Sequence, residues 1–84
     1  MKNIISNFQI ITTEKHHSTE GLKVVHIKFE YRNNSYNGTL YHSHNSDIVT
    51  LTKMIKEDSR SRSSLTTMDK VRGVIQVRYR EQLN

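Results

Sequence analysis

Hydrophobic and polar side chains alternate most regularly between Leu22 and Arg32. In an extended strand successive side chains point to opposite faces, so this period of two predicts a strand with one buried face and one solvated face. The buried face would carry Val25, Ile27, Phe29 and Tyr31, and the solvated face Val24, His26, Lys28, Glu30 and Arg32.

Two further strands are predicted on either side of this segment. Residues 8–13 are aromatic or β-branched at every position except Gln9, a composition that favours a strand. Asn33-Asn34 would turn the chain back, because Asn tolerates positive φ, and Asn37-Gly38 is the alternative turn. The first choice lets the third strand alternate, with Tyr36, Gly38 and Leu40 on one face and Thr39 and Tyr41 on the other. We therefore predict a three-stranded antiparallel β-meander over about residues 7–43.

A helical spacing follows the meander. Ile48, Leu51, Met54 and Ile55 recur at i, i+3, i+6 and i+7, which places them on one stripe of a helix. The preceding segment 45–47 offers N-cap side chains. These features predict a helix over about residues 47–58 and a polar loop over residues 59–64.

The C-terminal segment fits two structures. A helix over about residues 66–82, capped by Thr66 or Thr67, would bury one face, whereas a strand over residues 71–80 would use the many β-branched residues there. We predict the helix, because its apolar spacing persists beyond the window in which strand alternation holds. The helical face would carry Met68, Val71, Ile75 and Tyr79.

Length and composition indicate one small α+β domain over residues 1–84, with the meander packed against both helices. Hydrophobic residues make up only 33% of the chain, so the core is lean and a homodimer would add to its stability. The chain has no Cys, which excludes disulfides and thiolate chemistry. No apolar run approaches 18 residues and no signal-peptide pattern is present, so we expect a cytoplasmic protein without a membrane segment.

Positive charge is the main indication of function. The chain carries a formal net charge of +5, and five of its six arginines lie in the last 25 residues. Guanidinium groups bind phosphate in bidentate fashion and stack on bases, so this cluster predicts a basic module that contacts the nucleic-acid backbone, DNA or RNA. The predicted binding residues are Arg60, Arg62, Arg72, Arg78 and Arg80.

An alternative hypothesis is a small inhibitor or accessory protein, of the type encoded by phages or mobile elements, that binds a larger host protein. That partner would itself be a nucleic-acid enzyme or present an acidic surface, and the binding residues would include Tyr36 and Tyr41 on the sheet. Ordinary solvation of the positive charge is a third interpretation.

Enzymatic function is not expected. The sequence lacks the phosphate-binding, nucleophile-elbow and zinc-protease motifs, and its three glycines are too scattered to build a phosphate cradle. His42 and His44 would lie about 7 Å apart on one strand face, farther than two ligands of one metal prefer. We therefore predict no cofactor, no metal and no catalytic residues.

Overall fold

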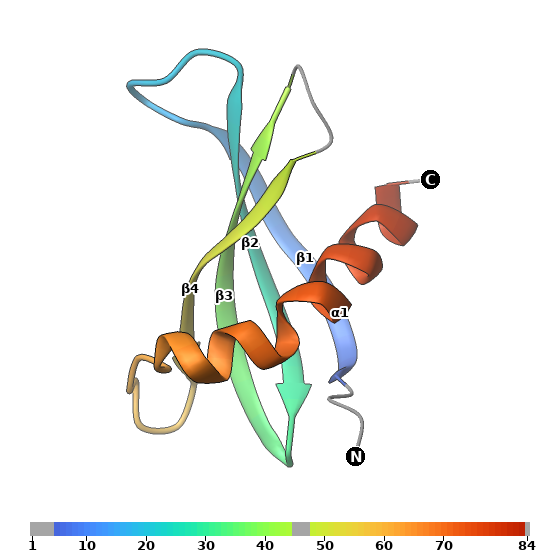
Figure 1. Ribbon diagram of the computed structural model, residues 1–84. Coiled ribbons are helices and arrows are strands. Elements are labelled where there is room, and N and C mark those ends of the chain that lie inside the picture. Colours follow the sequence, from blue (N-terminus) through green and yellow to red (C-terminus); the bar gives the residue numbers. More distant parts are fainter. Residues whose placement is uncertain (1–4, 45–47, 84) are drawn as a thin grey trace.

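The computed structural model describes residues 5–44 and 48–83. These residues form a four-stranded antiparallel sheet whose strands follow the chain order, β1 to β4, and a helix that crosses one face of the sheet (Figure 1). The elements are β1 (Ile5–Lys15), β2 (Leu22–Tyr31), β3 (Asn34–Ser43), β4 (Val49–Lys56) and α1 (Leu65–Leu83). The α+β class is therefore confirmed, with one more strand and one fewer helix than predicted.

The alternation in β2 builds the centre of the core. Its predicted apolar face is buried beneath α1, and the neighbouring positions on β3 and β4 complete the same layer. Burying a large apolar side chain contributes about 1.5–3 kcal/mol, so this layer is the main source of stability. Its strand members are Ile5, Val25, Ile27, Phe29, Tyr31, Tyr36, Leu40, Val49, Leu51 and Met54.

The turn between β2 and β3 lies one residue earlier than predicted. Arg32 and Asn33 both have positive φ, 51° and 65°, and Asn34 already pairs with Tyr31 as the first residue of β3. Two positive φ angles are what a two-residue hairpin turn requires. The alternative turn Asn37-Gly38 is wrong, because Gly38 lies inside β3 opposite Ile27.

The predicted helix over residues 47–58 is wrong: residues 49–56 form β4, and the N-cap segment 45–47 lies outside the described residues. The cause is a β-bulge. Leu51 pairs with Leu40 and Lys53 pairs with Thr39, so one extra residue of β4 separates two consecutive pairs. The next core-facing residue after Leu51 is therefore Met54, three positions on, and this spacing imitates a helix.

The C-terminal helix is confirmed, and the alternative strand over residues 71–80 is wrong. All four side chains of its predicted apolar face are buried. Ser64 caps the helix in place of the predicted Thr66 or Thr67, because its Oγ accepts the Thr67 N–H at 3.2 Å. Gln76 donates to the Val49 carbonyl at 2.6 Å and Gln82 to the Phe8 carbonyl at 3.0 Å, so α1 is attached to both edge strands.

The other face of the sheet is polar, and none of the described elements covers it (Figure 1). His26 bonds to Glu14 at 3.2 Å and Lys28 to Glu57 at 3.3 Å on this face. An antiparallel sheet with one packed face and one solvated face explains the clean alternation of β2. No helix within the described ranges has the length and apolar character needed to cross a membrane.

Candidate functional site at the β1–β2 hairpin end

The predicted arginine residues lie in two separate regions. Arg60 and Arg62 belong to the loop that precedes α1, whereas Arg78 and Arg80 belong to its C-terminal part. A helix of 19 residues is about 28 Å long, so these two pairs occupy opposite ends of α1.

Two of the arginines face carboxylates on the same helix. Arg72 forms an ion pair with Asp69 at 3.2 Å, and Arg78 approaches Glu81 at 4.0 Å. Both pairs are partly exposed, so they hold the guanidinium groups weakly but reduce the local positive potential. The structure therefore does not bring the five arginines together on one surface.

The two predicted interface tyrosines lie on opposite faces of the sheet. Tyr36 is only 8% exposed and stacks on Phe29 with ring centroids 5.7 Å apart, so it belongs to the core beneath α1. Tyr41 is half-buried on the open face. Only Tyr41 is therefore accessible to a partner.

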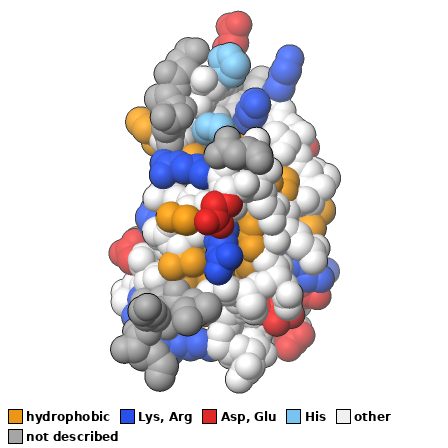
Figure 2. Space-filling model, turned by 90° about the vertical axis from the view of Figure 1, so that its right-hand side faces the viewer, with side chains coloured by type: hydrophobic (Ala, Val, Ile, Leu, Met, Phe, Trp, Pro, Cys, Tyr) orange, Lys and Arg blue, Asp and Glu red, His pale blue; other side chains and the backbone are white. Residues whose placement is uncertain are grey.

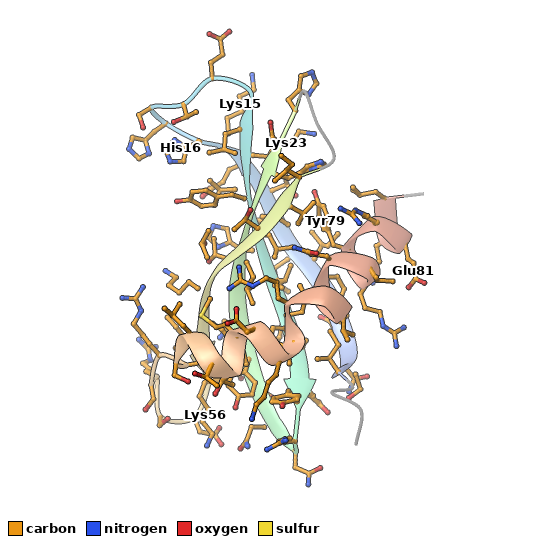
Figure 3. The ribbon with its side chains drawn as sticks, viewed as in Figure 1. Lys15, His16, Lys23, Lys56, Tyr79 and Glu81 are labelled. Carbon is orange, nitrogen blue, oxygen red and sulfur yellow. The ribbon has the colours of Figure 1, made fainter. Side chains whose placement is uncertain are left out.

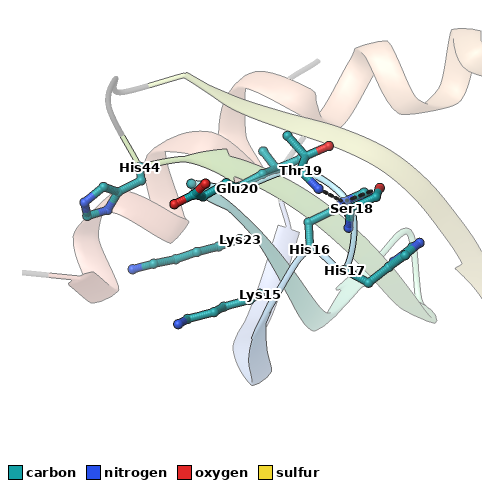
Figure 4. Close-up of a pocket in the computed structure, with 10 residues that line it drawn as sticks. Lys15, His16, His17, Ser18, Thr19, Glu20, Lys23 and His44 are labelled. Atoms are coloured by element: carbon teal, nitrogen blue, oxygen red, sulfur yellow. Dashed lines mark hydrogen bonds between the residues drawn. The ribbon is translucent and has the colours of Figure 1, made fainter.

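A basic hollow lies at the end of the sheet where β1 turns into β2 (Figures 3 and 4). It has a volume of about 630 Å³ and is lined by residues 15–23 and by His44, the residue that follows β3. The His44 N–H donates to the Gly21 carbonyl at 2.6 Å, which joins the end of β3 to this hairpin. We call the set Lys15, His16, His17, Lys23 and His44 the hairpin-end site.

Two lysines in this site are direct cross-strand neighbours. Lys15 of β1 and Lys23 of β2 are register partners and both are exposed. Figure 4 shows the two side chains extending side by side toward the side on which His44 lies. Within residues 5–44 and 48–83, neither lysine forms an ion pair. Like charges opposite each other destabilise a sheet, so this arrangement favours an anion that would sit between them.

His16 organises the turn that closes the hollow. Its Nδ1 accepts the backbone N–H groups of Ser18 at 3.2 Å and Thr19 at 3.1 Å. An acceptor at Nδ1 requires the ring proton to be on Nε2, so His16 is a neutral imidazole in this conformation. The His16 ring stacks against His17 with centroids 4.8 Å apart, and it forms a T-shaped contact with Tyr41 with centroids 5.5 Å apart.

The hairpin-end site is connected to the core through β3. His42, the register partner of Lys23, is hydrogen-bonded through Nδ1 to the Tyr79 hydroxyl at 2.8 Å. Tyr79 is 2% exposed, and this burial raises the pKa of its hydroxyl above 10.0. The C-terminal part of α1 is thereby fixed to the strand beside the site.

Among the described residues, no group of three or more His, Cys, Asp or Glu side chains is arranged to hold a metal ion. Three of the five histidines make hydrogen bonds within the fold: His16 accepts backbone N–H groups, His26 pairs with Glu14, and His42 bonds to Tyr79.

The lysine pair was not predicted, because the first strand was expected over residues 8–13 only and so ended before Lys15. The signal was the hairpin register: Lys15 and Lys23 are equidistant from the turn centre at Thr19, so they face each other if both strands extend to the turn. Comparisons of the chain with models of protein families, with curated proteins and with solved structures found no match.

Proposed function

We propose that this chain is a non-enzymatic module that binds the phosphate backbone of nucleic acid at the hairpin-end site. The observation that carries the proposal is the exposed Lys15–Lys23 pair, which forms no ion pair within the described part of the chain, although Glu20 lines the same hollow. A bound phosphate group replaces the repulsion between two ammonium groups with two attractive contacts.

The surroundings of the pair favour a polymer over a small phosphate. The hollow is open to solvent along the end of the sheet, and Figure 2 shows Lys and His side chains together with an acidic side chain at the upper end of the molecule. The net charge of +5 attracts a polyanion from a distance and holds it without base readout. Lysines act as hydrated point charges, which suits contacts to phosphate in any sequence.

The test is the salt dependence of binding to a fluorescently labelled oligonucleotide, followed by anisotropy. For the wild-type chain, log K falls linearly with log salt concentration, and the joint change Lys15→Gln and Lys23→Gln lowers the steepness by about 1.4 on a single strand or about 1.8 on a duplex. The matched control is Arg60→Gln with Arg62→Gln, which removes the same charge at the other end of α1.

The two double variants also separate the hairpin-end site from the arginine cluster predicted from the sequence. If the arginine variant loses the salt dependence and the lysine variant keeps it, the binding surface lies near the start of α1 and our site is wrong. If the wild-type chain shows no salt-dependent binding to either oligonucleotide, the nucleic-acid function itself is wrong.

One observation favours the alternative function, binding to a larger protein. The outer face of α1 carries a shallow apolar depression lined by Gly73, Val74, Val77, Arg78 and Glu81, and Val77 is 53% exposed. Hydrophobic side chains also gather in the middle of the face shown in Figure 2. Exposed apolar patches mark protein interaction sites. Val77→Asp would then abolish capture of a protein partner and leave oligonucleotide binding unchanged. The lysine variants would weaken oligonucleotide binding and leave capture of the protein partner unchanged.

A further inference from the structure

The rings beside the lysine pair point to the class of nucleic acid that the site prefers. Resting on the function proposed above, we propose that the hairpin-end site selects single-stranded nucleic acid by stacking one unpaired base on the exposed face of His17. The base would extend a stack of rings that is already formed, and Lys15 and Lys23 would contact the adjoining phosphates.

The ring stack has a defined geometry. His17 lies against His16 with an interplanar angle of 16°, and His16 meets Tyr41 edge-on at 71°. His17 is the outermost ring and is exposed, while His16 and Tyr41 are half-buried behind it. A flat aromatic surface open on one side is what a nucleobase needs for stacking, and it accepts every base.

The stack is held in place before any ligand arrives. The two backbone N–H groups that His16 accepts fix its ring relative to the turn, and the T-shaped contact with Tyr41 supports it from β3. No hydrogen bond restrains the His17 ring within the described residues. Because His16 is already fixed, binding has to order only the His17 ring, which reduces the entropy cost of stacking a base there.

Rings and cations lie on different sides of the same hollow. Figure 4 shows His16 and His17 on one side of it and the ends of Lys15 and Lys23 on the other. The two lysines lie on the α1 side of the sheet, because Lys23 pairs with His42, which bonds to Tyr79. The rings lie on the open side, because His16 packs against Tyr41. A nucleic-acid strand that passes around the hairpin end can therefore stack a base on the rings and place an adjoining phosphate at the lysines. In a duplex the bases are already stacked and paired, so only an unpaired base reaches such a platform.

Three probes of equal length isolate the contribution of the base. We would titrate the wild-type chain with an oligothymidylate of about twelve nucleotides, with a DNA duplex of that length, and with an abasic deoxyribose-phosphate strand that has the charges and no bases. We expect the oligothymidylate to bind about tenfold more tightly than the abasic strand, since stacking of one base supplies a factor of this size. A titration with an oligouridylate tests binding to RNA in the same way.

Variants at residue 17 separate the ring from its charge. His17→Ala should lower the affinity for oligothymidylate about tenfold and leave the abasic strand unaffected, whereas His17→Phe keeps a ring without a titratable proton and should retain the wild-type affinity. The matched control is His26→Ala, which removes an imidazole from the middle of the open face.

The outcomes distinguish this inference from the function on which it rests. Equal affinity for the oligothymidylate and the abasic strand would overturn stacking and leave backbone binding intact. Loss of affinity in His17→Phe as large as in His17→Ala would assign the role of His17 to its charge and overturn stacking too. If none of the probes binds, the nucleic-acid function fails as a whole.

Discussion

Replacement of Tyr79 by Phe tests how firmly α1 is fixed to the sheet. The substitution removes one hydroxyl and keeps the ring, so the apolar contacts of this 2%-exposed side chain persist. What is lost is the 2.8 Å hydrogen bond to His42 Nδ1, which joins the C-terminal part of α1 to β3. A net hydrogen bond contributes about 0.5–1.5 kcal/mol, and loss of one partner of a half-buried group adds to that, so we expect a destabilisation of about 1–2 kcal/mol at neutral pH.

At alkaline pH the same substitution has a second, opposite effect on stability, because it removes a group whose ionisation destabilises the folded wild-type chain. Burial raises the pKa of Tyr79 above its ordinary value of 10.0, so between that pH and the folded-state pKa the unfolded chain has lost the proton that the folded chain keeps. The unfolded state then binds fewer protons, and the free energy of unfolding falls as pH rises. Below pH 10.0 this contribution is fully present in the wild-type chain. The phenyl ring of the Tyr79→Phe variant does not titrate, so the stability difference between the two chains should shrink above that pH.

Urea unfolding followed by the helical circular dichroism signal measures both effects, because α1 is the helix of the described fold. The control is Tyr41→Phe, which removes a hydroxyl from the open face and should change stability little. Equal stability of wild type and Tyr79→Phe near neutral pH, or a difference that stays constant from about pH 8 to about pH 11, would refute this account of the Tyr79–His42 contact.

Three further substitutions test the packing by the same unfolding assay. Ile75→Ala removes a fully buried side chain between α1 and the sheet and should lower the free energy of unfolding by about 2–5 kcal/mol; a loss below about 1 kcal/mol would contradict this packing. Gly38→Ala should destabilise by about 1–3 kcal/mol, because the new Cβ would lie 3.1 Å from Ile27 Cγ1 and 3.2 Å from Ile27 Cδ1, and Ile27→Val in the same chain, which removes Cδ1, should recover part of that loss. Gly73→Ala should stabilise by up to about 1 kcal/mol, because Gly73 is an exposed position inside α1 with nothing within 4 Å of the added Cβ; a loss of stability there would mean that the position is constrained.

The sequence predicts those elements whose signal is local. The period of two in β2 and the period of the buried face of α1 each arise within one segment, and both elements are found where predicted. The same reasoning fails for β4, because the three-residue spacing from Leu51 to Met54 arises from a bulge against β3. A bulge is a property of two strands paired in a given register, so the sequence of one strand does not reveal it.

The candidate site is less predictable for a related reason. The arginines are close in sequence, but α1 is long enough to separate Arg60 and Arg62 from Arg78 and Arg80. Lys15 and Lys23 are separated in sequence, and the hairpin makes them neighbours. The composition of the chain therefore gives its net positive charge. It does not give the positions of the charged side chains in space, which depend on strand register and on the rise of the helix.

The distribution of stability in this fold explains why an unfavourable pair of charges can persist at the hairpin end. The fully buried side chains lie beneath α1, between β1 and β4, whereas Lys15, Lys23 and the His16–His17 stack lie beyond this layer at the end of the sheet. Repulsion between two exposed ammonium groups is small compared with the burial of the core, so the chain folds in spite of it. Proteins keep locally unfavourable residues mainly at functional sites. Residues that contribute nothing to the core and destabilise their own hairpin are therefore expected at a binding site. The Lys15–Lys23 pair meets both conditions, which is why we propose a binding site at this end of the sheet and not on the longer arginine-bearing surface of α1.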